Sequence, residues 1–91
     1  MVNDILEDSR GNLWVGTLSN GLYLRRNGSG KWEQFLHDHT SEGSLPGNSV
    51  NSIFEDSRGN LWISVNGNGI SRWNPDSNDF TTLNSRNGLP A

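Results

Sequence analysis

The chain has 91 residues, enough for one small domain, and its net charge of −3 comes from acidic and basic residues scattered along it. It contains no cysteine, which excludes disulfides and thiolate metal sites. It has no apolar run of membrane-spanning length and no signal-peptide pattern at its start, and its acidic balance argues against nucleic-acid binding.

The residue types favour an all-β fold. Ala, Lys and Met each occur once, so most good helix formers are nearly absent. Asn, Ser and Gly dominate instead, and these residues favour turns. We therefore expect short strands separated by tight turns.

The first half of the chain alternates strand-like segments with turn signals. In residues 8–12, the Asp side chain can accept backbone N–H bonds and Gly11 suits a left-handed position. Asn20-Gly21 is a strong hairpin signal, and a third turn follows at residues 27–30. The predicted strands are Val2–Glu7, Leu13–Thr17, Leu22–Arg26 and Lys31–Leu36.

The second half repeats this order after a polar connector at residues 37–49. Pro75 suits the early part of a type I turn between the last two strands. Leu-Pro occurs in the connector as Leu45-Pro46 and again as Leu89-Pro90. The predicted strands are 50–55, 61–65, 69–73 and 79–83, with a tail at 84–91.

An internal repeat explains this order. Glu-Asp-Ser-Arg-Gly-Asn-Leu-Trp occurs unchanged at residues 7–14 and 55–62, an offset of 48. A period in the high forties with several short strands is typical of β-propeller blades of four strands each. We divide the chain into residues 1–49, a first blade with its connector, and residues 50–91, a second blade with its tail.

The repeated residues resemble a known family. Ile-x-Glu-Asp-Ser-Arg-Gly-Asn-Leu-Trp, followed by Asn-Gly and a Leu-Pro connector, is similar to the two-component regulator propeller repeat. The resemblance covers essentially the whole chain as two consecutive antiparallel blades. It implies the extracytoplasmic sensor region of hybrid two-component regulators, a periplasmic location for the parent protein, and oligosaccharide ligands.

A blade pair leaves one face of each sheet uncovered, which predicts association. We expect copies of the chain to complete a ring, as three copies with six blades or four with eight. The chain begins with Met at a repeat boundary, which we interpret as the mark of an excised or engineered unit. The residues expected to pack between blades are Leu13, Trp14, Trp32, Leu61, Trp62 and Trp73.

Candidate ligand-binding residues come by analogy with other propellers, where ligands meet the connectors, the turns between the second and third strands, or the channel. The alternative is that these side chains serve the neighbouring backbone. We expect no metal, since His37-Asp38-His39 lacks a distant third ligand, and no cofactor. The candidates are Asn3, Asn20, His37, His39, Ser41, Asn51 and Asn66.

Three candidate functions are ranked by how well the sequence supports them. The first is a non-enzymatic propeller module that assembles into a ring. The second is an oligosaccharide-binding module of a sensor. An enzyme ranks last, because the Glu-Asp pairs at residues 7–8 and 55–56 recur within a turn motif and suit turn architecture better than acid–base catalysis.

Overall fold

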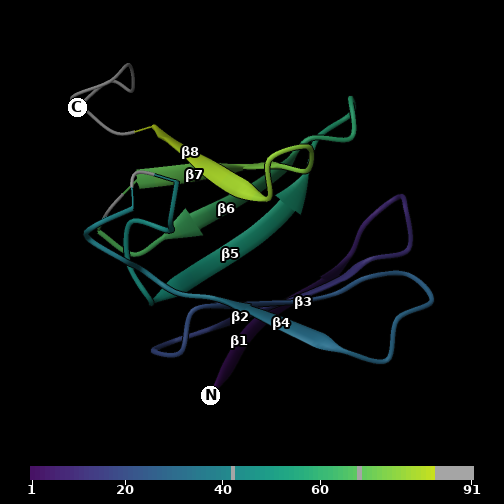
Figure 1. The fold of residues 1–91 in the computed structure, drawn as a ribbon, viewed down its shortest axis with the longest axis horizontal. Coiled ribbons are helices and arrows are strands. Elements are labelled where there is room, and N and C mark those ends of the chain that lie inside the picture. The colour runs from purple at the N-terminus through teal and green to yellow at the C-terminus, as the bar shows by residue number, and fades with distance from the viewer. Residues whose placement is uncertain (42, 68, 84–91) are drawn as a thin grey trace.

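The computed structural model describes residues 1–41, 43–67 and 69–83, and these residues form two four-stranded antiparallel sheets without helices (Figure 1). This confirms the all-β fold with two four-stranded blades. The strands are β1 (Val2–Glu7), β2 (Leu13–Thr17), β3 (Leu22–Arg25), β4 (Trp32–Phe35), β5 (Val50–Glu55), β6 (Leu61–Val65), β7 (Gly69–Asn74) and β8 (Asp79–Leu83).

Each sheet is a simple meander, with order β1-β2-β3-β4 in blade 1 and β5-β6-β7-β8 in blade 2. The predicted strand positions agree with the structure, except that β3 and β7 differ by one residue at one end and β4 differs by one residue at each end. The tail at 84–91, which includes Leu89-Pro90, lies outside the described residues, as does Asn68.

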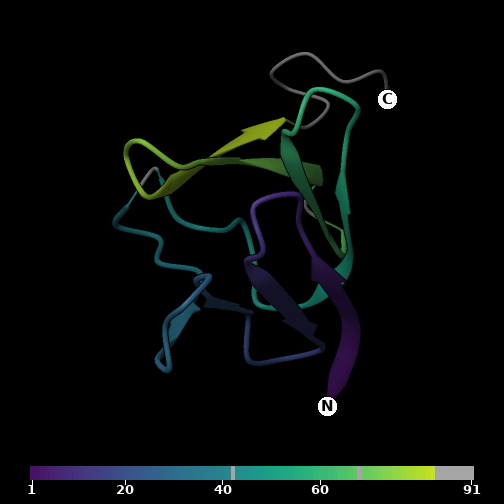
Figure 2. The same ribbon diagram turned by 90° about the vertical axis from the view of Figure 1, so that its right-hand side faces the viewer.

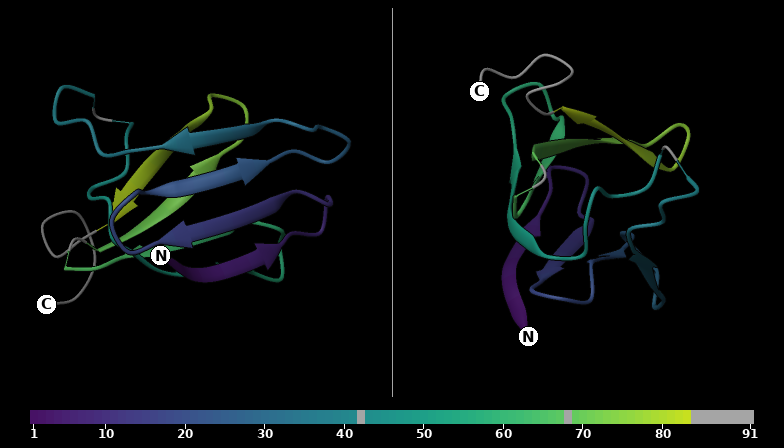
Figure 3. Two further views of the ribbon diagram at one scale, coloured as in Figure 1. Left: turned by 90° about the horizontal axis from the view of Figure 1, so that it is seen from below. Right: turned by 90° about the vertical axis from the view of Figure 1, so that its left-hand side faces the viewer.

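The two blades pack as a wedge. Their inner strands β1 and β5 lie side by side, and the sheets diverge toward the outer strands β4 and β8, with the connector between them (Figure 2). Figure 3 shows the same arrangement from below and from the opposite side. Consecutive propeller blades have this relation around a central axis.

Tight turns at one end set the strand register. In the β1–β2 turn the Asp8 N–H donates to Asn12 O at 2.9 Å, and Gly11 adopts a φ of 82°. Gly59 repeats this φ in the β5–β6 turn. The β7–β8 turn uses a non-glycine residue, Asn78, with a φ of 60°, because Asn tolerates the left-handed region better than most residues.

The core lies between the blades. Trp14 of blade 1 is fully buried and meets Trp73 of blade 2 edge to face, with 5.2 Å between ring centroids. The connector adds Leu45, which is also fully buried. The remaining core residues, all buried, are Leu22, Leu24, Val50, Ile53, Leu61, Ile63, Val65 and Phe80.

Gly16 of β2 packs closely against side chains of blade 2 in the core. A Cβ added at Gly16 would lie 2.5 Å from Cγ1 of Val50 in the facing strand. Val50 is fully buried, so its side chain has little room to move. A glycine on β2 therefore sets how closely β5 can approach.

Gly16→Ala should lower the free energy of unfolding by about 1–3 kcal/mol, because the new methyl group overpacks the joint between the blades. Gly30→Ala is the matched control, since a Cβ there would meet nothing within 4 Å. Urea denaturation followed by tryptophan fluorescence measures both variants. Equal stability of the two variants would contradict the close approach at Gly16.

Candidate functional site

The internal joint, the contact between blade 1 and blade 2, is closed at the inner strands by polar side chains. The Asn3 side-chain amide donates to Val50 O and to Asn51 O, both at 3.0 Å. The Asp4 carboxylate accepts from the Ile53 N–H at 2.8 Å. Asn3, a predicted ligand-binding residue, thus holds the neighbouring backbone in this structure.

The turn end of the internal joint carries a second set of hydrogen bonds. The Ser9 N–H and hydroxyl donate to the two carboxylate oxygens of Glu55, at 2.9 and 2.7 Å. Arg10 Nη1 reaches Gly59 O at 3.4 Å. The repeated turn of blade 1 is therefore docked on the repeated turn of blade 2.

The aspartate of each repeated Glu-Asp pair has a structural use within its own turn. One oxygen of Asp8 accepts the N–H groups of Arg10 and Asn12, both at 2.9 Å. The other accepts the Asn12 amide at 3.2 Å and the Trp14 indole N–H at 2.9 Å. Asp56 holds Arg58, Asn60 and Trp62 in the same way.

These hydrogen bonds favour the ionised carboxylate. The Trp62 indole and the Asn60 and Arg58 N–H groups together lower the pKa of Asp56 from 3.8 to about 2. At Asp8, burial raises the pKa, but the bonds from Trp14, Asn12 and Arg10 outweigh it, and the pKa is lowered overall. Both carboxylates are therefore charged at neutral pH.

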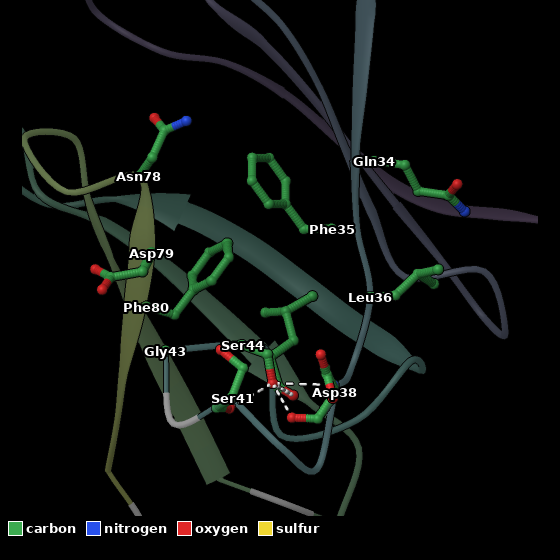
Figure 4. Close-up of a pocket in the computed structure, with 11 residues that line it drawn as sticks. Gln34, Phe35, Leu36, Asp38, Ser41, Gly43, Ser44, Asn78, Asp79 and Phe80 are labelled. Carbon is green, nitrogen blue, oxygen red and sulfur yellow. Dashed lines mark hydrogen bonds between the residues drawn. The ribbon is translucent and has the colours of Figure 1, made fainter.

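The connector lines a cleft beside the outer strands (Figure 4). Phe35 of β4 and Phe80 of β8 pack edge to face on its wall, with 5.4 Å between ring centroids. The Ser44 hydroxyl donates to Asp38 O at 2.9 Å and so closes a loop of the connector. The cleft encloses about 370 Å³.

Three predicted ligand residues of the connector come together. His37, His39 and Ser41 line a neighbouring cavity of about 450 Å³ with Thr82 of β8. The His37 ring Nδ1 lies 2.7 Å from Leu45 O, and the backbone N–H of His37 donates to Asn48 Oδ1 at 2.6 Å. One ring nitrogen of His37 is thus engaged by the connector itself.

The other predicted ligand residues lie apart from this cavity. Asn20 is exposed in the β2–β3 turn, where its N–H donates to Thr17 Oγ1 and its carbonyl accepts from Gln34. Asn66 is exposed in the β6–β7 turn, and its N–H donates to Ser49 O. Asn51 is exposed on β5 beside Asn3.

The predicted packing residues divide into three groups. Trp14, Trp73 and Leu61 belong to the core of the internal joint. Leu13 and Trp62 are half-buried, because they face away from that joint. Trp32 is 48% exposed on the outer side of blade 1, with the Arg25 guanidinium 5.5 Å from its ring centroid.

Each blade keeps one sheet face that the other blade does not cover. The open face of blade 1 includes Ile5, 59% exposed, and an apolar hollow of about 370 Å³ lined by Val15, Tyr23 and Trp32. The open face of blade 2 includes Phe54, 45% exposed. The strand registers add Leu13 and Arg25 to the open face of blade 1, and Trp62, Ser64, Ile70 and Arg72 to that of blade 2.

Within residues 1–41, 43–67 and 69–83, no three His, Asp or Glu side chains gather closely enough to hold a metal ion. The same residues include no helix with the length and hydropathy needed to cross a membrane.

Sequence reasoning missed two features. The first is the indole–carboxylate bond, although a visible signal exists: Asp and Trp recur six residues apart at Asp8/Trp14 and Asp56/Trp62. The second is Leu45, a connector residue that is buried in the core. Its signal is an apolar residue within an otherwise polar connector.

Asp56→Asn should weaken the dependence of stability on pH. A folded-state pKa of about 2 against a reference of 3.8 means that the charged carboxylate stabilises the fold above pH 4, and that this contribution is lost as pH falls toward 2. Denaturation midpoints measured between about pH 2 and 6 should therefore vary less in Asp56→Asn. Asp76→Asn, in an exposed turn, should keep the native profile; an unchanged profile in Asp56→Asn would contradict the turn's role.

The sequence matches one family model. The model described as "Two component regulator propeller" matches residues 1–19 and 44–67, which contain the first two strands of each blade. Among curated proteins, no sequence matches the chain significantly.

Solved structures share the fold. The extracellular domain of BT3049 from B. thetaiotaomicron, described as a hybrid two component system, aligns over 99% of this chain with a TM-score of 0.86 and 20% identity. The extracellular domain of BT4673 from the same organism, described likewise, aligns over 91% with a TM-score of 0.75 and 24% identity.

The chain spans 13% of the BT3049 chain and 11% of the BT4673 chain, so its likeness to them covers two blades of far longer proteins. The repeated turns, the eight-strand topology and the matched segments agree with one another. The chain therefore consists of two consecutive β-propeller blades that carry two-component regulator propeller repeats.

Proposed function

We propose that this chain is a non-enzymatic blade module of an extracytoplasmic sensor propeller, and that its two open faces join further blades as the internal joint does. The apolar hollow on the open face of blade 1 carries this proposal, because a sheet face with exposed Ile5 and Trp32 favours a covering partner. The saturated carboxylates of Asp8 and Asp56 support a structural role over a catalytic one. The solved neighbours, which are extracellular domains, support the location.

A second copy of the chain is the neighbour we propose. The repeat offset makes the open face of blade 2 equivalent to the blade 1 side of the internal joint. It likewise makes the open face of blade 1 equivalent to the blade 2 side. Copies can therefore stack head to tail, and three or four of them give six or eight blades in a closed ring.

Two sets of internal hydrogen bonds can recur between copies. Asn51 stands where Asn3 stands, so its amide can donate to Val2 O and Asn3 O of the next copy. Ser57 stands where Ser9 stands, so it can donate to Glu7 of the next copy, as Ser9 does to Glu55. This role for Asn51 competes with its predicted role in ligand binding.

One position requires an adjustment between copies. In the internal joint, a Cβ at Gly16 would lie 2.5 Å from a methyl group of Val50. In the joint between copies, Ser64 stands in place of Gly16 and Val2 in place of Val50, so the serine Cβ would meet the valine. Val2 is exposed at the end of β1, whereas Val50 is fully buried, so Val2 has more room to move. The joint between copies should therefore form, but more weakly than the internal joint.

Ser64→Gly should strengthen self-association, because it removes this steric conflict, and Trp32→Ala should weaken it, because it removes apolar area from the joint. Native mass spectrometry and sedimentation velocity should show masses of three or four times 10.1 kDa for the native chain at high concentration. Leu18→Ala is the control, since Leu18 is an exposed apolar residue of the β2–β3 turn, outside both faces.

A monomer at all concentrations, in the native chain and in Ser64→Gly alike, would contradict the proposal of a ring of copies. An effect of Leu18→Ala equal to that of Trp32→Ala would contradict the proposed use of the open face. Circular dichroism shows that each variant keeps its strands.

Oligosaccharide binding is the second candidate, and the connector cavity favours it. His37, His39, Ser41 and Thr82 surround about 450 Å³ with hydrogen-bonding groups of the kind that bind sugar hydroxyls. Calorimetry with a panel of neutral and acidic oligosaccharides tests it. Binding that His39→Ala weakens and Asn20→Ala leaves unchanged would support this cavity, and no heat across the panel would contradict it.

A further inference from the structure

We propose that charge repulsion weakens the contact between copies, because stacking brings Arg72 of one copy against Arg25 of the next. This inference rests on the proposed self-association and names what regulates it. It predicts an association that strengthens as salt rises, the reverse of most contacts between charged proteins.

The internal joint shows what this location normally contains. Leu24 on blade 1, 1% exposed, and Trp73 on blade 2 line one cavity of about 220 Å³ between the blades. Trp73 also meets Trp14, the cross-strand partner of Leu24. Two apolar side chains thus line the same cavity between the blades, together with polar residues of the turns, and the Arg26 guanidinium lies 6.0 Å from the Trp73 ring centroid.

On the two open faces, the strand registers place an arginine at the position equivalent to Leu24 and another at the position equivalent to Trp73. Leu24 pairs with Trp14 of β2, and Arg72 pairs with Trp62 of β6, so Arg72 takes the place of Leu24 on the open face of blade 2. Trp73 pairs with Phe80 of β8, and Arg25 pairs with Trp32 of β4. Arg25 therefore takes the place of Trp73 on the open face of blade 1.

The carboxylates near these two arginines are already engaged. Asp8, which lines the cavity of the internal joint, is bound within its own turn, and so is Asp56 at the equivalent position of blade 2. In blade 1, Glu33 is the cross-strand neighbour of Leu24 and forms an ion pair with Arg26 at 2.6 Å. In blade 2, Thr81 stands in place of Glu33 and Asn74 in place of Arg26, so this carboxylate is missing beside Arg72.

Glu7 is the carboxylate on the same row as Arg25, with Leu13 between them. In the internal joint Glu55 accepts hydrogen bonds from Ser9, so Glu7 is expected to accept the equivalent bonds from Ser57 of a neighbouring copy.

Neither arginine is held by a carboxylate within the described residues. Arg25 stacks over Trp32 at 5.5 Å, and Arg72 Nη2 lies 3.5 Å from Asn74 Oδ1. Burying both guanidinium groups in one contact adds repulsion and a desolvation cost. Salt screens that repulsion, and replacing one arginine by glutamate turns it into attraction.

The test is a charge-reversal set measured by sedimentation at about 0.02 M and about 0.5 M NaCl, where screening differs several-fold. The native chain should associate more tightly at high salt. Arg25→Glu and Arg72→Glu should each associate about tenfold more tightly than the native chain at low salt, and added salt should weaken them. The double variant Arg25→Glu/Arg72→Glu should return to weak association.

Lys31→Glu makes the same change in net charge outside the proposed pair, and it should leave the salt dependence of the native chain unchanged. An equal gain in association in Lys31→Glu, or single variants that keep the native salt dependence, would contradict the repulsion between Arg25 and Arg72 but not the ring of copies. If the native chain, Ser64→Gly and both single variants are all monomers, the proposed stacking is contradicted, and so is the proposed repulsion between the two arginines.

Discussion

Each of the two sheets has apolar side chains on both faces, and covering those faces is the constraint on which the structure depends. The internal joint covers one face of each sheet by placing Trp14 and Leu24 against Trp73, Phe80 and their neighbours. The wedge shape follows, because the inner strands meet while the outer strands diverge (Figure 2). Leu45 of the connector then fills part of the space between the sheets.

The internal joint combines apolar packing in its middle with hydrogen bonds at its edges. Asn3 and Asp4 bind the facing backbone along the inner strands, and Ser9 binds Glu55 at the turns. Edge hydrogen bonds add direction to a hydrophobic contact, which by itself is non-directional.

Most of the fold follows from the sequence, because the repeat, the turn residues and the strand alternation all indicate the same topology. The turn at residues 8–12 is an example, since its Asp and Gly have the predicted conformations. The candidate site was less accessible. Asn3 lies on an inner strand, and only the placement of the second blade shows that its amide binds the backbone of Val50 and Asn51.

Contacts between distant segments explain what sequence reasoning could not reach. The burial of Leu45 and the approach of Gly16 to Val50 both depend on how the connector positions blade 2. Residue types indicate that Trp32 suits a packed face, but neither of the two blades covers it. Half of its surface is therefore exposed here.

The identical turns at residues 7–14 and 55–62 also bear on how such a protein changes over generations. A genetic crossover between these two copies would insert or remove one 48-residue unit, and the recombined turn would still read Glu-Asp-Ser-Arg-Gly-Asn-Leu-Trp. Because that turn is held by Asp, Asn and Trp side chains of its own, it would fold in either context. The number of blades can thus vary without a damaged junction, and the blade faces decide which of those lengths survive.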